Sequence, residues 1–241
     1  MYGQCKTENS NVSLPWLENS LEELNKSFEI KDVTISGGEP SVLGDFYLEL
    51  LIRLCKLYTK RLRLITNLKT TNRAILNNFE SIDVSLNFNG FDSEIDSTLT
   101  NIREICNNKT INVKSIDRSC KDNPTQIIDL LNSLKIKSWE IIPYHHTEYL
   151  PFKNNDYHFY EDIVKQYLSL YKEMNFAFQN RLQLQDILKK DNYNTQTIYI
   201  TPNDKFAVQT FDNTGNFALQ ELDGIAEISK YYKNFEKIQS L

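Results

Sequence analysis

The residues best suited to chemistry are two glycines and a carboxylate that follow a short β-branched stretch. Residues 32–36 lead directly into Gly37, Gly38, Glu39 and Pro40. The stretch predicts a short buried strand, and paired glycines let the backbone turn sharply and offer its N–H and C=O groups to a ligand. Glu39 adds a negative charge at the carboxyl end of the strand, where α/β sheets hold their ligands. We expect a binding site here; the alternative is a strand-to-helix turn that needs glycine only for its geometry.

This order of strand, Gly-Gly-Glu-Pro and helix resembles the cofactor-binding motif of the radical S-adenosylmethionine enzymes. In that family the backbone of the motif and its acidic side chain hold the amino group of the methionine moiety. The chemistry agrees, because an ammonium group is bound well by carbonyl groups and a carboxylate in a partly desolvated site. The resemblance therefore implies that S-adenosylmethionine is the cofactor and that Gly37, Gly38, Glu39 and Pro40 bind it.

The resemblance also implies a [4Fe–4S] cluster, which three thiolates of a Cys-x3-Cys-x2-Cys loop ahead of the first helix would bind. Cys5 fits the last cysteine of that loop, but no partner cysteine precedes it. Two explanations stay open. Either a preceding strand and two cysteines are missing from this chain, which we favour, or the lineage has lost the cluster. For Cys5 alone, an incidental thiol is the simpler alternative.

Polar residues also end the next two predicted strands, at 61–66 and 81–87. Asn67 follows Thr66, and Leu68 stands where the family often has the glycine of Thr-Asn-Gly. The amide of Asn67 is suited either to a ligand or to capping the following helix. Ser85 and Asn87 alternate with apolar residues, and the resemblance implies that they approach the ribose of the cofactor. The alternative is that these groups satisfy nearby backbone.

The strand predicted at 138–143 is followed by Tyr144, His145 and His146. It resembles the apolar strand ending in Leu-Pro-Tyr/Phe-His of the enzymes that activate glycyl-radical proteins. The resemblance implies that Ile142 and Tyr144 flank the adenine, because a planar base stacks on apolar and aromatic side chains. The two histidines fit a polar loop or, alternatively, a substrate contact or proton donor. They make a poor zinc site, since no further ligand stands at suitable spacing.

Two cations and a cysteine follow near the end of the strand predicted at 110–117. Lys114 and Arg118 are interpreted as solvated loop charges, with a cation that faces the lumen and binds a carboxylate as the alternative. Cys120 is predicted to lie in a polar loop, where it is a candidate auxiliary thiol or hydrogen-atom donor.

These residues require an element order that brings strand ends together. Strand–helix units alternate from residue 32 to 144, which predicts a parallel sheet covered by helices. The fold class is therefore α/β, and one more strand ahead of the first helix would complete a partial (β/α)6-type barrel of radical S-adenosylmethionine type. The expected strands lie near 32–36, 61–66, 81–87, 110–117 and 138–143.

The chain changes character after residue 150. We expect a helix at 157–174 and then a C-terminal antiparallel meander at 195–201, 205–211 and 216–222, separated by turn sequences. The predicted organisation is a core at 1–150 and an extension at 151–241. The extension has no cysteine that could bind an auxiliary cluster, and we interpret it as a lid, a peptide-docking edge or a dimer contact.

Composition limits the remaining functions. The net charge of −5 is spread without a basic block, so nucleic acid is not an expected partner. No apolar run has membrane-spanning length and no signal-peptide pattern is present, so we expect no membrane association. The cysteines lie far apart and indicate no disulfide framework, which together with the missing signal favours the cytoplasm.

The combined prediction is a radical S-adenosylmethionine enzyme of oxidoreductase type. The resemblance implies that a [4Fe–4S] cluster, supplied with electrons by a reductant such as flavodoxin or ferredoxin, yields a 5′-deoxyadenosyl radical that abstracts hydrogen from a substrate. The meander favours a peptide or protein substrate, and a small molecule stays open. The alternative is a non-catalytic partner protein that keeps the barrel and has lost the cluster.

Overall fold

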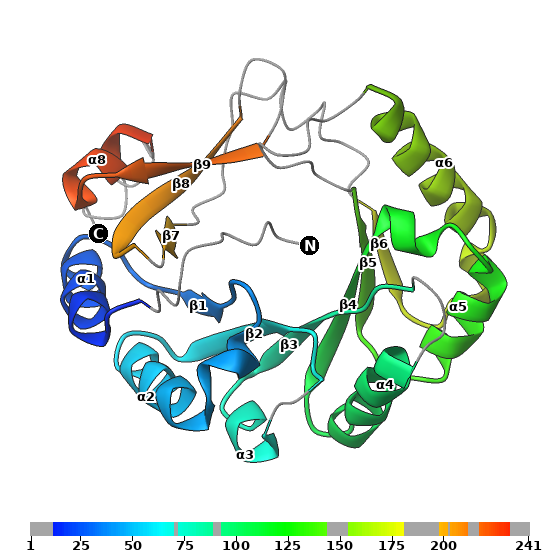
Figure 1. Cartoon of the computed structure of the whole chain (residues 1–241), viewed down its shortest axis with the longest axis horizontal. Coiled ribbons are helices and arrows are strands. Elements are labelled where there is room, and N and C mark those ends of the chain that lie inside the picture. The colour runs from blue at the N-terminus through cyan, green and yellow to red at the C-terminus, as the bar shows by residue number, and fades with distance from the viewer. Residues whose placement is uncertain are drawn as a thin grey trace.

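The computed structural model describes residues 12–69, 72–88, 93–143, 154–180, 198–201, 203–211 and 217–231. Its main feature is a six-stranded parallel sheet with strand order β1-β2-β3-β4-β5-β6. The sheet curves without closing into a barrel, and its helices lie on the outer side (Figure 1). The strands are β1 (Asp32–Ile35), β2 (Arg61–Thr66), β3 (Ser81–Ser85), β4 (Thr110–Ile116), β5 (Ser138–Ile142) and β6 (Ala177–Asn180).

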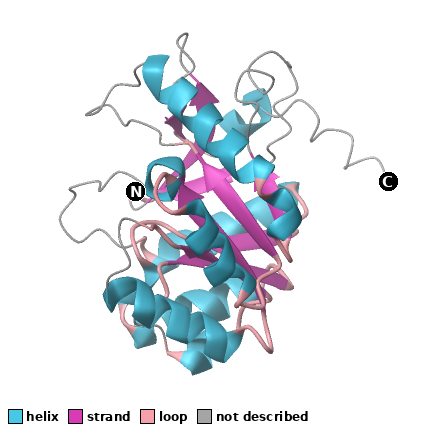
Figure 2. Cartoon of the chain, turned by 90° about the vertical axis from the view of Figure 1, so that its right-hand side faces the viewer, coloured by secondary structure: helices cyan, strands magenta, loops and turns pink. Residues whose placement is uncertain are grey.

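Helices follow the strands in the alternating order that the sequence predicts. Viewed from the side of α5 and α6, the helices lie in front of the strands (Figure 2). No helix in the described ranges has the length and apolar character needed to cross a membrane. The helices are α1 (Leu14–Ser27), η1 (Pro40–Leu43), α2 (Asp45–Lys56), α3 (Arg73–Leu76), α4 (Ser93–Ile105), η2 (Asp117–Cys120), α5 (Pro124–Asn132), α6 (Asn154–Ser169), η3 (Tyr171–Glu173) and α8 (Ile225–Tyr231).

The α/β fold and the five predicted strands are confirmed, with β3 ending at Ser85 rather than Asn87. The predicted burial of β1 was wrong, since Ile35 is its one buried residue. The sixth strand of the sheet was not foreseen. It is β6, which follows α6 and pairs in parallel with β5, from Ser138 with Ala177 to Ile141 with Asn180. α6 and β6 thus extend the parallel sheet beyond residue 150, and the division of the chain near that residue stays a prediction. The extra strand expected ahead of α1 would fall outside the described residues.

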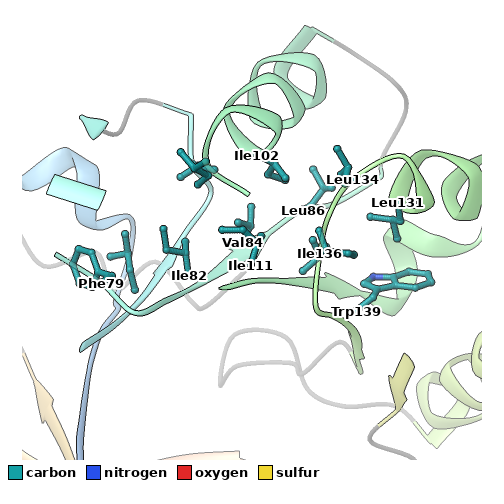
Figure 3. Close-up of a cluster of buried hydrophobic side chains, with 14 of the residues drawn as sticks. Phe79, Ile82, Val84, Leu86, Ile102, Ile111, Leu131, Leu134, Ile136 and Trp139 are labelled. Atoms are coloured by element: carbon teal, nitrogen blue, oxygen red, sulfur yellow. The ribbon is translucent and has the colours of Figure 1, made fainter. Parts of the chain in front are cut away.

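The main core lies between the sheet and the helices. Ile82 and Val84 of β3, Ile102 of α4 and Trp139 of β5 are fully buried there (Figure 3). Parallel strands whose outer face is covered by helices must be apolar on that face, which explains the β-branched residues. The Trp139 indole N–H donates to Ser115 Oγ at 3.1 Å, so its one polar group is satisfied within the core.

A second, smaller core joins the C-terminal segment to the first helix. The predicted meander is confirmed as β7 (Ile198–Thr201), β8 (Lys205–Phe211) and β9 (Phe217–Leu222), which form an antiparallel sheet in that order. Phe206 and Leu222 pack in one buried cluster with Leu24 of α1, and the rings of Trp16 and Phe206 lie 5.3 Å apart. The small sheet is therefore fixed to the start of the chain that leads into β1.

Candidate functional site

The glycine turn stands at the carboxyl end of β1, before η1. Gly37 has a φ of +135°, a conformation that residues with a side chain rarely adopt, so its glycine is required by the turn. Gly38 has no such φ, and no atom lies within 4 Å of the place that a Cβ would take. Both glycines are exposed, whereas Pro40 is buried as the first residue of η1. The geometry of the turn explains Gly37 but leaves Gly38 without a structural requirement.

Glu39 connects the ends of β1 and β2. Its Oε1 accepts hydrogen bonds from Thr66 Oγ1 at 2.6 Å, from Ser41 Oγ at 3.0 Å and from Ser41 N at 3.1 Å. Its Oε2 accepts one from Asn67 N at 2.6 Å. Since each carboxylate oxygen offers about two lone pairs, Oε2 keeps acceptor capacity for a ligand. The carboxylate is therefore fixed in position beside the exposed glycine backbone.

Asn67 lies directly beside Glu39 but does not cap the next helix. The cap of α3 is Asn72, whose Oδ1 accepts from Ala74 N at 2.9 Å, so the cap alternative for Asn67 was wrong. Asn67 Oδ1 instead accepts from Lys69 N at 3.0 Å, closing a local turn. The side chain is half-buried at the strand end, and its contact with a ligand stays a prediction.

Leu68 keeps the conformation that a glycine would adopt easily. Its φ is +58°, in the left-handed region, and its side chain is fully buried. A left-handed backbone costs a residue with a Cβ about 1–2 kcal/mol, which burial of a leucine side chain offsets. Its carbonyl accepts from Asn101 Nδ2 at 2.7 Å, which holds the turn in place. The chain therefore retains the turn after β2 although it lacks the glycine.

The other predicted ligand contacts lie at neighbouring strand ends. Ser85 is half-buried at the end of β3 and is in register with Lys114 of β4. Asn87 is exposed, and its Oδ1 accepts from Ile116 N at 3.2 Å, which is the backbone contact considered as its alternative. Ile142 is half-buried at the end of β5. Binding of ribose or adenine by these residues stays a prediction.

Several candidates lie outside the described residues. They are Cys5, Tyr144, His145 and His146.

An ion network that the sequence analysis missed covers the inner face of the sheet. Asp83 Oδ2 lies 2.9 Å from Lys114 Nζ and 3.2 Å from Arg63 Nη2, and Lys114 lies 3.5 Å from Glu140. Interpreting Lys114 as a solvated loop charge was wrong, because it stands within β4 with 18% of its side chain exposed. The available signal was a single charge between two apolar neighbours in β2, β3 and β5, namely Arg63, Asp83 and Glu140. Because side chains alternate along a strand, this pattern places the charges on the face opposite the apolar residues. Arg118 does lie at the surface, with its guanidinium carbon 5.9 Å from the centre of the Phe159 ring.

The described cysteines do not fit the [4Fe–4S] cluster that the resemblance implies. Burial raises the pKa of both the Cys55 and the Cys120 thiol to about 12, so neither offers a thiolate near neutral pH. Cys106 is half-buried and donates to Arg103 O at 3.4 Å. Within the described ranges, no three His, Cys, Asp or Glu side chains are grouped so that they could hold a metal ion.

Cys120 is also not the loop thiol that was expected. It is the last residue of η2 and is fully buried, and its carbonyl accepts from Tyr167 Oη at 2.9 Å. Its role in the structure is that of a small apolar side chain in the core.

Comparison with known proteins supports the fold but gives no sequence relative. The sequence matches no known family model and no curated protein. Among solved structures, SuiB from Streptococcus suis bound to its precursor peptide SuiA aligns with a TM-score of 0.54 at 16% identity over 83% of this chain and 48% of SuiB. The structure of anSMEcpe with bound AdoMet aligns with a TM-score of 0.54 at 14% identity, over 77% of this chain and 60% of that chain.

At these identities the likeness establishes the fold alone, which is a partial (β/α)6 type with a small antiparallel sheet added. The chain spans about half to three-fifths of the length of these structures.

Proposed function

We propose that this chain is a radical S-adenosylmethionine enzyme that binds its cofactor at the carboxyl ends of β1 and β2. The observation that carries the proposal is the exposed backbone of Gly37 and Gly38 beside the fixed carboxylate of Glu39. Carbonyl groups and a carboxylate with remaining acceptor capacity suit the ammonium group of the methionine moiety. The fold supports the proposal because anSMEcpe, which shares it, was solved with AdoMet bound.

The remaining contacts of the cofactor follow the curve of the sheet. Ser85, at the end of β3, and Asn87 are proposed to bind the ribose, and Asn67, after β2, is proposed to contact the cofactor through its amide. Ile142, at the end of β5, and Tyr144 are proposed to flank the adenine. A neutral hydroxyl suits a diol, and apolar side chains suit a planar base. In this proposal the protein binds and orients the cofactor at the carboxyl ends of its strands.

A peptide or protein is the proposed substrate class. SuiB, which shares the fold, was solved with its precursor peptide. When bound, the cofactor and cluster would take one electron from a flavodoxin- or ferredoxin-like protein, and the 5′-deoxyadenosyl group so released would accept a hydrogen atom from this substrate. The described residues supply no ligand set for the cluster, so their proposed part is confined to binding and orientation. Cys5 stays the proposed metal ligand.

A second candidate function rests on the described cysteines, which do not fit a cluster. It is a binding protein with this fold that recognises the cofactor or a partner without catalysis. Iron counting and electron paramagnetic resonance after anaerobic reconstitution of the whole chain separate the two functions. About four irons per chain, with a spectrum that changes on adding S-adenosylmethionine, supports the enzyme. Absence of iron together with intact cofactor binding supports the second candidate.

Gly38→Ala tests the proposed binding site directly. The added methyl group meets no atom within 4 Å and the backbone has no positive φ, so the variant should fold as well as the wild type. If the cofactor lies against this backbone, the same methyl group takes the space of the ligand. Titration calorimetry with S-adenosylmethionine should then show an affinity at least about tenfold lower, the equivalent of about 1.4 kcal/mol.

Gly224→Ala is the matched control. Gly224 also has open space for a Cβ and no positive φ, but it lies between β9 and α8. Its variant should bind the cofactor like the wild type. Equal affinity of Gly38→Ala and Gly224→Ala would refute binding at the glycine turn.

A further inference from the structure

Two arginines of β2 lie on the inner face of the sheet but use their guanidinium groups differently. Arg61 is bound by both oxygens of Asp32, with Nε at 2.8 Å from Oδ1 and Nη2 at 2.9 Å from Oδ2. Arg63 makes one such contact, from Nη2 to Asp83 Oδ2 at 3.2 Å, and 44% of its side chain is exposed. Among the described residues, most of the five N–H donors of the Arg63 guanidinium therefore have no protein acceptor.

Asp83 has its closest cation in Lys114 rather than in Arg63. The Asp83 side chain is only 2% exposed, and a carboxylate buried to this degree must be paired. Lys114 Nζ lies 2.9 Å from Oδ2, and Asn112 Nδ2 donates to Oδ1 at 2.8 Å. The longer contact to Arg63 adds a second cation to a carboxylate that these groups already satisfy. Asp83 therefore orients the guanidinium of Arg63, whereas the buried charge of Asp83 is compensated mainly by Lys114.

We propose that Arg63 binds a carboxylate group of the substrate on the inner face of the sheet, with Asp83 as its positioning residue. The planar fork of an arginine binds a carboxylate through two parallel hydrogen bonds, which a lysine cannot do. The proposal rests on the proposed function and deepens it, because it specifies an acidic side chain or a free C-terminus as a feature of the peptide.

The position of Arg63 suits the substrate better than the cofactor. Arg63 stands three residues before the end of β2, about 10 Å along the strand at 3.3 Å per residue. Its register partners are Thr34 of β1 and Ser81 of β3, both below the strand ends where Glu39 is bound. The amino and carboxylate groups of S-adenosylmethionine are on one carbon atom, so a cofactor held by the glycine turn keeps its carboxylate at the strand ends. A group that reaches Arg63 then belongs to a second molecule.

Titration with N-acetylglutamate, followed by the Nε–H resonances of arginine in nuclear magnetic resonance spectra of the full chain, tests the proposal. The Arg63 signal, assigned by its loss in Arg63→Lys, should shift saturably with N-acetylglutamate and not with N-acetylglutamine amide, which is neutral and has no carboxylate. Arg63→Gln, followed by backbone amide signals, should lower the affinity about tenfold or more, as expected for loss of charged hydrogen bonds. Arg63→Lys keeps a cation beside Asp83 and should also bind more weakly because it lacks the fork.

Arg61→Gln is the matched control, since Arg61 lies on the same strand and face with its fork already occupied. It should leave N-acetylglutamate affinity unchanged. An equal loss in both variants, or no saturable shift in the wild type, overturns the proposal. If Arg63→Gln weakens S-adenosylmethionine binding as strongly, the carboxylate is that of the cofactor and the substrate assignment is wrong. Binding of N-acetylglutamate at Arg63 without any cofactor binding supports this site and counts against the proposed function instead.

Discussion

Replacing Glu39 with glutamine should destabilise the protein by about 3 kcal/mol although it changes only one oxygen to an amide nitrogen. The glutamine carbonyl can take over the three hydrogen bonds of Oε1, but as neutral bonds each weaker by roughly 0.5 kcal/mol. The amide nitrogen then faces Asn67 N, a donor that loses its acceptor, which costs about 1.5 kcal/mol more. For a chain of this length the melting temperature should fall by about 6–12 °C.

Urea unfolding followed by tryptophan fluorescence measures this change, since the chain has Trp16 in the small core and Trp139 in the main core. A double-mutant cycle of Glu39→Ala with Thr66→Val isolates the bond to Thr66 Oγ1, which at 2.6 Å is among the shortest of the four, because alanine removes the acceptor that glutamine keeps. We expect a coupling free energy of about 1–2 kcal/mol. Glu29→Gln is the control, because Glu29 is exposed and makes no side-chain contact among the described residues. This substitution should change the free energy of unfolding by less than about 0.5 kcal/mol.

A coupling free energy near zero would refute the assignment of Glu39 as the connection between β1 and β2. A loss of stability for Glu29→Gln equal to that of Glu39→Gln would refute the argument from hydrogen bonds, since general charge effects would then explain both.

Three further predictions concern the surroundings of this site. Leu68→Gly should be at least as stable as Leu68→Ala by urea unfolding, reversing the usual order, because the φ of +58° costs alanine about 1–2 kcal/mol and glycine almost nothing; a clearly less stable glycine variant would contradict this. Lys114→Met should cost about 3 kcal/mol because it removes the closest cation of the buried Asp83, whereas Arg63→Gln should cost less than about 1 kcal/mol, and equal losses would contradict the network. Burial raises the pKa of Cys120 from 9.0 to about 12, so its contribution to stability is complete below pH 9 and is lost as the pH rises toward 12. Unfolding free energies measured from pH 9 to 11 should fall with pH, and in Cys120→Ala this slope should be smaller by up to about 1.4 kcal/mol per pH unit.

The glycine turn and the sheet that carries it could be predicted from the sequence because their signals are local. A β-branched run that ends in Gly37 and Gly38 restricts the backbone within a few residues, and the structure has the strand and the left-handed Gly37 there. Alternation of strands and helices predicted the parallel pairing, since two parallel strands need a crossover between them. The register and curvature of the sheet follow from packing and were beyond local signals.

The sixth strand was missed because its signal is weak and depends on the fold. β6 has only four residues, Ala177–Asn180, and follows η3 without the apolar run that marks the other strands. Its neighbour β5 provides the backbone partners and the rings of Trp139 and Phe178, 5.7 Å apart, provide packing. Long-range contacts of this kind determine a strand without leaving a pattern in its own sequence.

The inner-face network was missed for a different reason. Asp83 and Glu140 each stand alone between apolar neighbours, and a single charge in a strand is equally suited to solvent and to a partner on the next strand. Only the structure shows that these charges meet, because it places Asp83 Oδ2 2.9 Å from Lys114 Nζ and Lys114 in register with Glu140. The sequence thus predicts that one face is polar, and the pairing decides which charges are already satisfied.

The two faces of the sheet differ in the kind of side chain that they carry. The inner side chains of a closed (β/α)8 barrel are apolar layers that fill its centre, whereas here that side carries Arg63, Asp83, Lys114 and Glu140. A polar inner face cannot hold the sheet together by packing, so the outer face and the helices must provide the stability, as the fully buried Ile82, Val84 and Trp139 do. That division leaves the side chains of the inner face free of a packing role, as the proposed carboxylate site at Arg63 requires. It also explains why a fixed carboxylate at the strand ends and a partly paired arginine below them can coexist without weakening the core.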